Sequence, residues 1–213
     1  MRPLVLASSS PRRAELLQAA GLPFVVRVAP VDETQHAGEA PDAYVRRLAV
    51  AKARAAAAAP HELVLGADTV VVAGAGSRLV CLGKPADAAD AAAMLRQLAG
   101  CTHDVLTGVA LVRAGEPVAV DVAATRVTFA PMTDSDVAWY VATTEPYDKA
   151  GGYAVQDTVF APVERLDGCY LNVVGLPLCA VAAGLASVGL DVEQVGSPPC
   201  RYCERGKSVV EIR

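Results

Sequence analysis

The stretch close to the amino terminus combines hydroxyl groups, a helix start and two arginines. An apolar run at residues 4–7 is followed by three serines at 8–10, by Pro11, and by Arg12 and Arg13. The last serine suits the N-cap position and Pro11 suits the first helical position. Free backbone N–H groups, hydroxyls and guanidinium groups are the usual ligands of a phosphate. This stretch therefore predicts an anion site, with a capped helix whose arginines point into water as the alternative.

A carboxylate interrupts the most apolar segment of the chain. Residues 63–73 form a nearly continuous apolar run, typical of a strand covered on both faces, with Asp68 near its centre. A buried carboxylate must be hydrogen-bonded, paired with a cation or bound to a metal. Gly66 and Ala67 leave room for a ligand beside it. A site at Asp68 and a purely structural ion pair with an arginine are both compatible with this pattern.

Further charged residues stand where a site could use them. Glu33 follows a predicted strand at 24–28, and loops at strand ends often build α/β sites. Lys52 lies at the edge of the apolar stripe of a predicted helix, so its ammonium either snorkels into water or enters a cleft. Lys84 stands in a Gly-Lys-Pro turn, where a solvated lysine is the ordinary case, and no P-loop spacing surrounds it.

A late polar cluster includes an amide that could recognise a ligand. Two glycines at 151–152 allow the backbone to bend, and Gln156 can donate and accept hydrogen bonds at once, as a pyrimidine imide edge requires. An ordinary turn glutamine is the alternative. The three histidines lack the spacing of zinc ligands.

Several of these blocks, in this order, resemble the Maf family of nucleoside triphosphate pyrophosphatases. Residues 6–17, Leu-Ala-Ser-Ser-Ser-Pro-Arg-Arg-Ala-Glu-Leu-Leu, resemble its opening signature. Residues 47–53 resemble its second basic motif, Gly-Ala-Asp-Thr at 66–69 its catalytic motif, and Lys-Ala-Gly-Gly-Tyr-Ala-Val-Gln at 149–156 its late motif. The resemblance extends over about residues 4–190.

The resemblance implies a fold, a reaction and a set of site residues. The fold is α/β, an elongated mixed sheet flanked by helices in two lobes with a central cleft, often as a homodimer. The reaction is hydrolysis between the α and β phosphates, which yields the monophosphate and pyrophosphate. By motif position, the resemblance assigns catalysis to Asp68, Glu33, Lys52 and Lys84, phosphate binding to Ser8, Ser10 and Arg13, and substrate specificity to Arg12, Thr69 and Gln156.

These roles are chemically coherent. A Mg²⁺ or Mn²⁺ ion held by Glu33 and Asp68 would offset phosphate charge, and Asp68 is the expected base for water activation. Arg13, Lys52 and Lys84 would stabilise the leaving pyrophosphate.

The residues at the specificity positions resemble one subgroup. Arg12, Thr69 and Gln156 match the dTTP and UTP enzymes, whereas the 7-methyl-GTP subgroup tends to carry an aromatic residue, Gln and Glu there. A 7-methyl-GTP enzyme and a non-enzymatic nucleotide-binding regulator of septum formation remain alternatives.

Composition narrows the class of protein further. The 213 residues are 53% hydrophobic and only 5% aromatic, so the core should be built from small side chains. A net charge of -4 argues against broad nucleic-acid binding. The longest apolar stretch, 173–190, is interrupted by Gly and Pro, and residues 3–7 are too short for a secretory signal. We therefore expect a cytoplasmic protein without a disulfide framework or a membrane span.

The pattern of elements favours one α/β unit at residues 1–195. A tail at 196–213 follows a Pro-rich linker and carries a single CxxC, Cys200 and Cys203, which is half of a zinc site; we expect it to be unstructured or loosely docked. Periodicity, capping and turn residues predict helices at 11–20, 41–59, 88–99, from about 133 and within 173–190, and strands at 4–7, 24–28, 63–73, 79–82, 103–113 and 118–129, with Phe160 and Tyr170 on a hairpin.

Overall fold

The fold is built on one long mixed sheet. The computed structural model describes residues 4–74, 76, 79–190 and 209–211. In these residues the strands follow the order β2-β1-β3-β5-β6-β7-β8, and β4 pairs with β3 off this path. β1 runs parallel to β2 and β3, and the other pairs are antiparallel. The strands are β1 (Leu4–Leu6), β2 (Phe24–Val26), β3 (Leu63–Ala73), β4 (Val80–Leu82), β5 (Thr102–Arg113), β6 (Glu116–Phe129), β7 (Val163–Asp167) and β8 (Val209–Glu211).

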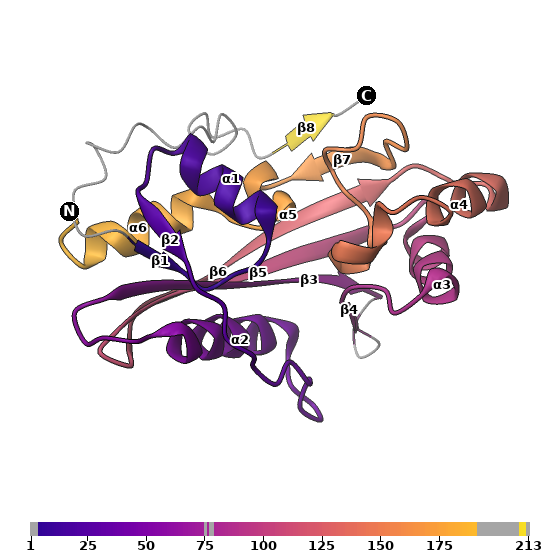
Figure 1. The fold of residues 1–213 in the computed structure, drawn as a ribbon. Coiled ribbons are helices and arrows are strands. Elements are labelled where there is room, and N and C mark those ends of the chain that lie inside the picture. Colours follow the sequence, from indigo (N-terminus) through magenta and orange to yellow (C-terminus); the bar gives the residue numbers. More distant parts are fainter. Residues whose placement is uncertain (1–3, 75, 77–78, 191–208, 212–213) are drawn as a thin grey trace.

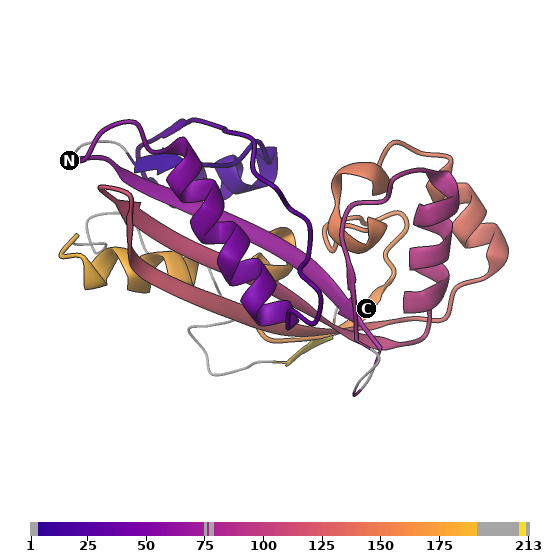
Figure 2. The same cartoon turned by 90° about the horizontal axis from the view of Figure 1, so that it is seen from below.

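Helices cover both faces of this sheet. α2 lies across one face, while α1, α5 and α6 lie on the other (Figure 1). α3 and α4 gather at the far end of the long strands, where the view from below separates them from α2 (Figure 2). The helices are α1 (Pro11–Ala19), α2 (Pro41–Ala56), α3 (Ala88–Leu98), α4 (Asp134–Val141), α5 (Tyr170–Val174) and α6 (Leu178–Ser187), with the short 3-10 turns η2 (Pro146–Asp148) and η3 (Ala150–Gly152).

Two apolar clusters make two lobes on the shared sheet. Leu17, Leu65 and Leu176 belong to the cluster beneath α1, α5 and α6. Leu95 and Tyr140 belong to the cluster of the far lobe, where α3 and α4 pack. Since β5 and β6 contribute to both clusters, the lobes share their longest strands. The expected α/β fold, an elongated mixed sheet in two lobes, is confirmed.

Two glycines allow α2 to lie directly on the sheet. A Cβ atom at Gly66 of β3 would overlap the carbonyl oxygen of Ala49, and one at Gly108 of β5 would overlap that of Val45. Both residues of α2 are fully buried. The missing side chains let the helix backbone approach the strands closely, which brings Lys52 within reach of β3.

α2 ends three residues before the expected boundary. After Ala56 the backbone becomes extended, and the Glu62 carboxylate accepts hydrogen bonds from the N–H groups of Ala58 and Ala59. Glu62 also pairs with Arg27 at 2.7 Å. The N–H groups after Ala56 thus have acceptors outside the helix. The high helix propensity of alanine therefore does not extend α2 beyond Ala56.

The expected hairpin carrying Phe160 and Tyr170 is wrong. Phe160 lies in a turn and stacks on Tyr140, with ring centroids 3.8 Å apart, whereas Tyr170 begins α5. The strand between them, β7, pairs with β6 instead. Gly168, at φ 131°, lies against Thr125 and turns the chain from β7 into α5.

The tail contributes a strand that the sequence analysis did not anticipate. Val209–Glu211 pairs antiparallel with β7, with Leu166 opposite Val210. The expected boundary at residue 195 and the cysteines Cys200 and Cys203 lie outside the described residues. Of the other cysteines, Cys81 and Cys101 carry free thiols. Within the described chain, no helix has the length and apolarity needed to cross a bilayer.

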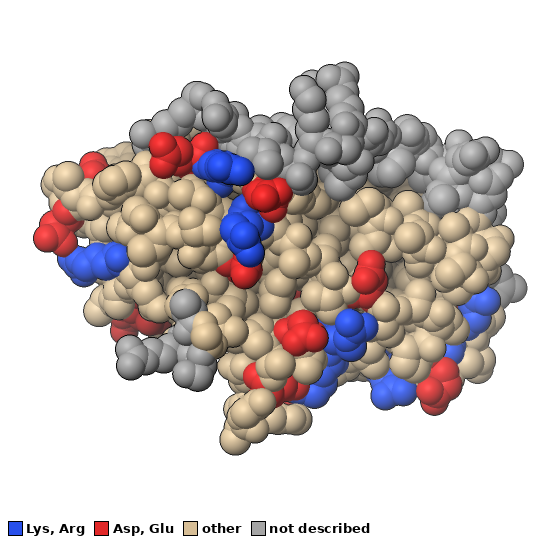
Figure 3. All heavy atoms as spheres, turned by 180° about the vertical axis from the view of Figure 1, so that it is seen from behind, with Lys and Arg blue, Asp and Glu red and all other residues tan. Residues whose placement is uncertain are grey.

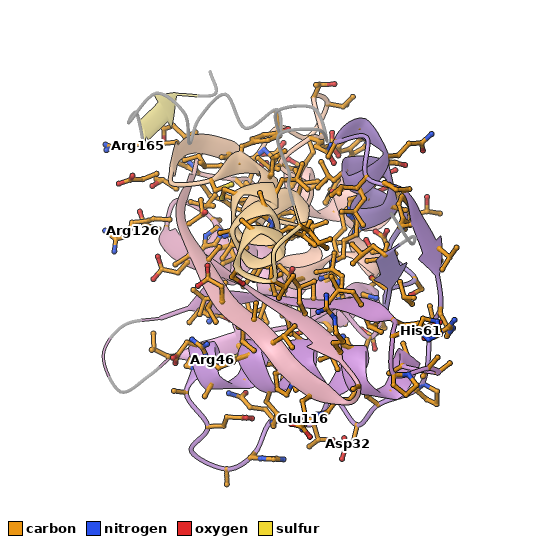
Figure 4. All side chains as sticks on the ribbon, turned by 90° about the vertical axis from the view of Figure 1, so that its left-hand side faces the viewer. Asp32, Arg46, His61, Glu116, Arg126 and Arg165 are labelled. Carbon is orange, nitrogen blue, oxygen red and sulfur yellow. The ribbon has the colours of Figure 1, made fainter. Side chains whose placement is uncertain are left out.

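The charged side chains are spread over the surface. On the face shown in Figure 3, basic and acidic side chains are interspersed over the described residues. Viewed along the sheet in Figure 4, Arg126 and Arg165, from the neighbouring strands β6 and β7, point outward on the same side. His61 also lies at the periphery in this view.

His103, by contrast, is buried in the far lobe. Its Nε2 atom lies 2.9 Å from the Tyr153 hydroxyl, and the rings of Tyr153 and Phe129 contact it edge to face. Burial lowers the pKa of His103 from 6.5 to about 4. The native state therefore keeps this imidazole neutral at pH values where the unfolded chain protonates it.

We predict that His103 makes the protein less stable in mild acid. Its contribution is complete above about pH 6.5 and is lost as the pH falls toward 4, in total about 3 kcal/mol of unfolding free energy. His103→Gln should flatten this slope relative to the parent, and His61→Gln at the surface should leave it unchanged. Urea unfolding between pH 4 and 7.5 measures all three slopes; equal slopes in the parent and His103→Gln would contradict the assignment.

Candidate active site

A cavity lies at a gap along one edge of β3. β1 pairs with β3 as far as Leu65, and β4 pairs with it only from Val71 onward. Between these two points, no strand in the described part of the chain covers this edge. A cavity of about 460 Å³ lies there, lined by Asp68 and Thr69 of the exposed edge and by residues of both lobes. The two-lobe cleft predicted from the sequence is therefore present.

Asp68 points to the face of the sheet that α2 covers. It is only 7% exposed. Lys52 of α2 donates a 2.6 Å hydrogen bond from Nζ to Asp68 Oδ1, and the same ammonium lies 2.8 Å from Glu33 Oε1. Pairing with a cation is one of the three arrangements that the sequence analysis left open for Asp68, although the partner is Lys52 and not an arginine. Lys52 also lines the cavity. A single lysine thus joins two carboxylates at the cavity wall.

The loop that carries Glu33 is fixed by α2. The Tyr44 hydroxyl donates to the Glu33 carbonyl at 2.8 Å, and Arg47 donates to the Thr34 carbonyl at 3.0 Å. Arg47 also binds Glu39 at 2.6 Å, which lowers the pKa of Glu39 to about 2. Burial raises the pKa of Tyr44, with further contributions from the charges of Asp68 and Glu33. These contacts hold Glu33 beside Lys52.

Arg13 lies on the opposite side of β3 and is bound almost entirely by protein oxygens. Its Nε donates to the Gly175 carbonyl at 2.8 Å, and Nη1 donates to the Ala67 carbonyl at 2.8 Å and to Ser8 Oγ at 3.1 Å. Nη2 donates to Thr69 Oγ1 at 3.1 Å. Burial lowers the pKa of this guanidinium. Arg13 is therefore a fixed positive charge in the cavity wall.

The serine turn faces the cavity with part of its hydrogen-bonding capacity unused. Ser10 occupies the N-cap position of α1, but its side chain forms no capping hydrogen bond. Ser8 Oγ accepts from the Ser10 N–H at 3.2 Å and from Arg13, so Ser8 shapes the turn. All three serines line the cavity together with the start of α1. The turn offers hydroxyl and N–H groups to an anion.

An ionic bridge crosses the rim of the cavity. Arg12 of α1 pairs with Asp148 of η2 at 2.7 Å, and Lys149 contacts the other Asp148 oxygen at 2.6 Å. Burial raises the pKa of Asp148, but its hydrogen bonds to Lys149 and Arg12 outweigh this and lower it. The sequence analysis marked this segment for its paired glycines, for Gln156 and for the motif at 149–156, but not for Asp148. The available signal was the group of charged residues Glu145, Asp148 and Lys149. It did not indicate that Arg12 would pair with Asp148.

Lys84 and Gln156 line the same cavity as exposed side chains. Neither side chain has a hydrogen bond or ion pair with any other described residue, so both can bind a ligand without breaking an internal contact. The Gly151 N–H donates to the Gly83 carbonyl at 2.9 Å and fixes the turn beside Lys84. One part of the cavity wall is apolar, formed by Val71, Val105, Tyr153, Val155 and Val174.

The acid pair fits a hard divalent cation. Glu33 and Asp68 both contact Lys52 Nζ, so their carboxylates lie close together. Mg²⁺ is usually held by one or two carboxylates, with substrate phosphates and water completing its shell. Within the described residues, no three His, Cys, Asp or Glu side chains gather into a metal site. A cation here would therefore need substrate oxygens as further ligands.

Fold and cavity together define a class of protein. Cations and a helix start suit phosphates, the acid pair suits a metal-bound polyphosphate, and an apolar wall beside a free amide suits a heterocyclic base. The class is that of α/β proteins that bind nucleotides.

Comparison with known proteins identifies the family within this class. The family model described as Maf-like protein matches residues 3–188. The chain belongs to the Maf family. It is 48% identical over 193 residues to the dTTP/UTP pyrophosphatase of Symbiobacterium thermophilum, which covers 90% of this chain and 97% of the relative.

Two further relatives carry the same name. The dTTP/UTP pyrophosphatase of Anaeromyxobacter dehalogenans is 50% identical over 189 residues, 87% of this chain and 94% of the relative. That of Myxococcus xanthus is 50% identical over 188 residues, 88% of this chain and 93% of the relative. The similarity thus spans both lobes.

We predict that Arg13 contributes far more to stability than its neighbour Arg12. A lysine at position 13 cannot reach all four acceptors, so Arg13→Lys should lower the free energy of unfolding by roughly 2 to 4 kcal/mol. Arg12→Lys changes one partly exposed ion pair and should cost less than about 1 kcal/mol. Urea unfolding of the two variants tests this, and equal losses would show that the buried contacts of Arg13 are not the stabilising ones.

Proposed function

We propose that the protein is a nucleoside triphosphate pyrophosphatase that hydrolyses dTTP and UTP to the monophosphate and pyrophosphate. The observation that carries this proposal is the Asp68 carboxylate, buried on a strand edge inside a cavity otherwise rich in phosphate-binding groups. The names of relatives about half identical in sequence support the same activity and the same pair of substrates.

The reaction follows from the groups that face the cavity. A water oxygen forms a bond to the α phosphorus while the bond from that phosphorus to the α,β-bridging oxygen breaks, and pyrophosphate leaves. Asp68 takes the proton from the attacking water. Lys52, 2.6 Å from Asp68, and Lys84, which pairs with no other described residue, stabilise negative charge on the leaving group, while the serine turn holds phosphate oxygens.

We further propose that Glu33 and Asp68 hold a Mg²⁺ or Mn²⁺ ion together with the substrate. When bound, the ion supplies charge neutralisation and lowers the pKa of a coordinated water. In the free protein, the Lys52 ammonium is paired with both carboxylates. When the ion binds to these carboxylates, the substrate phosphates offer the ammonium new acceptors. The same lysine then serves the acid pair before binding and the phosphates after it.

The charge of the cavity supports this combination. Five cationic side chains and three acidic ones line it, a formal balance of +2 in a chain whose net charge is -4. A nucleoside triphosphate carries roughly four negative charges, about two of which a bound divalent cation offsets. The metal complex of the substrate therefore matches the cavity better than the free triphosphate does. The cationic residues are Arg12, Arg13, Lys52, Lys84 and Lys149, and the acidic ones are Glu33, Asp68 and Asp148.

Base specificity is assigned to three other residues that line the cavity. Arg12, Thr69 and Gln156 line one continuous space, so all three can contact one substrate. The free Gln156 amide can pair with the carbonyl and N–H groups of a uracil or thymine edge. A base with the wrong pattern would leave polar groups unpaired in the complex and would bind less tightly.

We predict that Asp68→Asn retains the fold and loses turnover. The amide preserves packing and removes the base and a metal ligand, so kcat for dTTP should fall by about 10² to 10⁴-fold. Asp134→Asn, at an exposed ion pair with Arg96, is the matched control and should retain activity. Pyrophosphate release with Mg²⁺ or Mn²⁺ and thermal unfolding measure both variants. Turnover within about threefold of the parent would remove Asp68 from the mechanism.

We also predict the substrate order of the parent protein. kcat/KM should be higher for dTTP and UTP than for any purine triphosphate, and Gln156→Glu should reduce this preference because a carboxylate cannot donate to a base carbonyl. A panel that includes GTP and 7-methyl-GTP provides the measurement. A better rate with 7-methyl-GTP would overturn the pyrimidine assignment alone, whereas no turnover of any nucleotide would overturn the activity.

A further inference from the structure

A buried hydroxyl pair lies behind the cavity wall. Thr69 of β3 stands directly opposite Thr107 of β5 in the strand register, and their Oγ1 atoms are 2.9 Å apart. Thr107 is fully buried, whereas Thr69 lines the cavity. Thr107 Oγ1 donates to the Asn172 carbonyl of α5 at 3.2 Å. Thr107, which cannot touch a ligand in the cavity, therefore contacts Thr69, which can.

These bonds fix the direction of each hydroxyl proton. The Asn172 carbonyl can only accept, so the single Thr107 proton points to it. Thr107 must then accept from Thr69, which uses the single Thr69 proton. One lone pair of Thr69 Oγ1 accepts from Arg13 Nη2 at 3.1 Å. Thr69 therefore has no hydroxyl proton left to donate toward the cavity. The second lone pair of its Oγ1 atom can still accept a hydrogen bond.

The acceptor at the end of this chain is itself held in place. The Asn172 carbonyl also accepts from the Gly175 N–H at 3.0 Å, and the Gly175 carbonyl accepts from Arg13 Nε at 2.8 Å. The bonds thus form a closed ring through Arg13, Thr69, Thr107, Asn172 and Gly175. Gly175 has φ 122°, a backbone conformation that residues with a side chain rarely adopt. The ring therefore depends on glycine at this position.

The Asn172 side chain anchors the ring to the sheet. Its Nδ2 donates to the Val105 carbonyl and to Thr125 Oγ1, each at 2.9 Å. Asn172 is fully buried, so neither bond competes with water. The carbonyl that orients Thr107 therefore has little freedom to move.

We propose that Thr107 is a positioning residue for substrate specificity. It fixes the Thr69 hydroxyl as a hydrogen-bond acceptor toward the cavity, and this acceptor selects a ligand that presents an N–H or O–H donor to it. This inference rests on the proposed function for the identity of the ligand. Uracil and thymine carry a donor at ring nitrogen 3, where cytosine has a lone pair. The sugar 3′-hydroxyl is the other donor that dTTP and UTP share and that could bind Thr69.

The test compares substrates that differ at one possible partner of the Thr69 hydroxyl. UTP and CTP have donor and acceptor exchanged at ring nitrogen 3 and at position 4 of the base, and UTP and 3′-deoxy-UTP differ only in the sugar hydroxyl. Thr107→Val removes the buried acceptor with little change in shape and frees the Thr69 proton to rotate toward the cavity. Thr107→Ser retains the hydroxyl. Thr102→Val is the matched control, because Thr102 forms a similar 3.0 Å pair with Thr128 at an exposed position.

We expect Thr107→Val to lower the UTP to CTP ratio of kcat/KM by about five- to tenfold, chiefly through KM, as the loss of one hydrogen bond predicts. Thr107→Ser and Thr102→Val should stay within about twofold of the parent. A fall in the UTP to 3′-deoxy-UTP ratio instead would support the proposal and assign the donor to the sugar. Both ratios unchanged in Thr107→Val, or equal shifts in Thr102→Val, would overturn it.

Binding separates this inference from the proposed function. Dissociation constants of UMP, CMP and 3′-deoxy-UMP, measured by calorimetry on the same four proteins, require no turnover. If the parent releases pyrophosphate but Thr107→Val changes neither ratio, the function stands and the role of Thr107 falls. If the parent shows no turnover, the shift in the binding ratios still supports or overturns the role of Thr107. Thermal unfolding identifies any variant that fails to fold.

Discussion

The site depends on how the buried charge of Arg13 is satisfied. Burying a cation is costly unless acceptors surround it, and here three elements supply them. The Ala67 carbonyl belongs to the strand edge that neither β1 nor β4 covers, so the guanidinium takes the place of a neighbouring strand. The same gap exposes Asp68 on one face and Thr69 on the other. One missing pairing thus brings residues from both faces of the sheet into one cavity.

Sequence reasoning found the parts of this arrangement that local chemistry dictates. The β3 boundaries followed from apolar run length, and the need of Asp68 for a polar or charged partner followed from the cost of a bare buried carboxylate. Lys52 could be placed at the edge of the apolar stripe of α2, because helix periodicity fixes the direction of its Cα–Cβ bond. Capping residues also located the starts of α3 and α4, where Asp87 and Thr133 accept hydrogen bonds from the first turn.

The rest depends on contacts between distant segments, which no local pattern encodes. Arg13 was expected to grip phosphate with free donors, yet four of its hydrogen bonds go to residues that only the folded chain brings together. The relation between Thr69 and Thr107 requires the β3 and β5 register. Arg12 and Asp148 are 136 positions apart in the sequence. The strand at residues 209–211 likewise forms only because β7 offers it an edge.

The position of Asp68 among the cations of the cavity favours the proposed hydrolysis over simple binding of a metal-free triphosphate. A protein that only retained a triphosphate would gain affinity from every cation in the cavity and lose it with every carboxylate, because like charges repel strongly where water is excluded. Asp68 nevertheless lies buried among those cations, and α2 is packed onto glycines so closely that Lys52 reaches it. Lys52 offsets the cost of this acid in the free protein. Under the proposed function, this carboxylate would help to hold the metal complex of the substrate and would accept the proton of the attacking water.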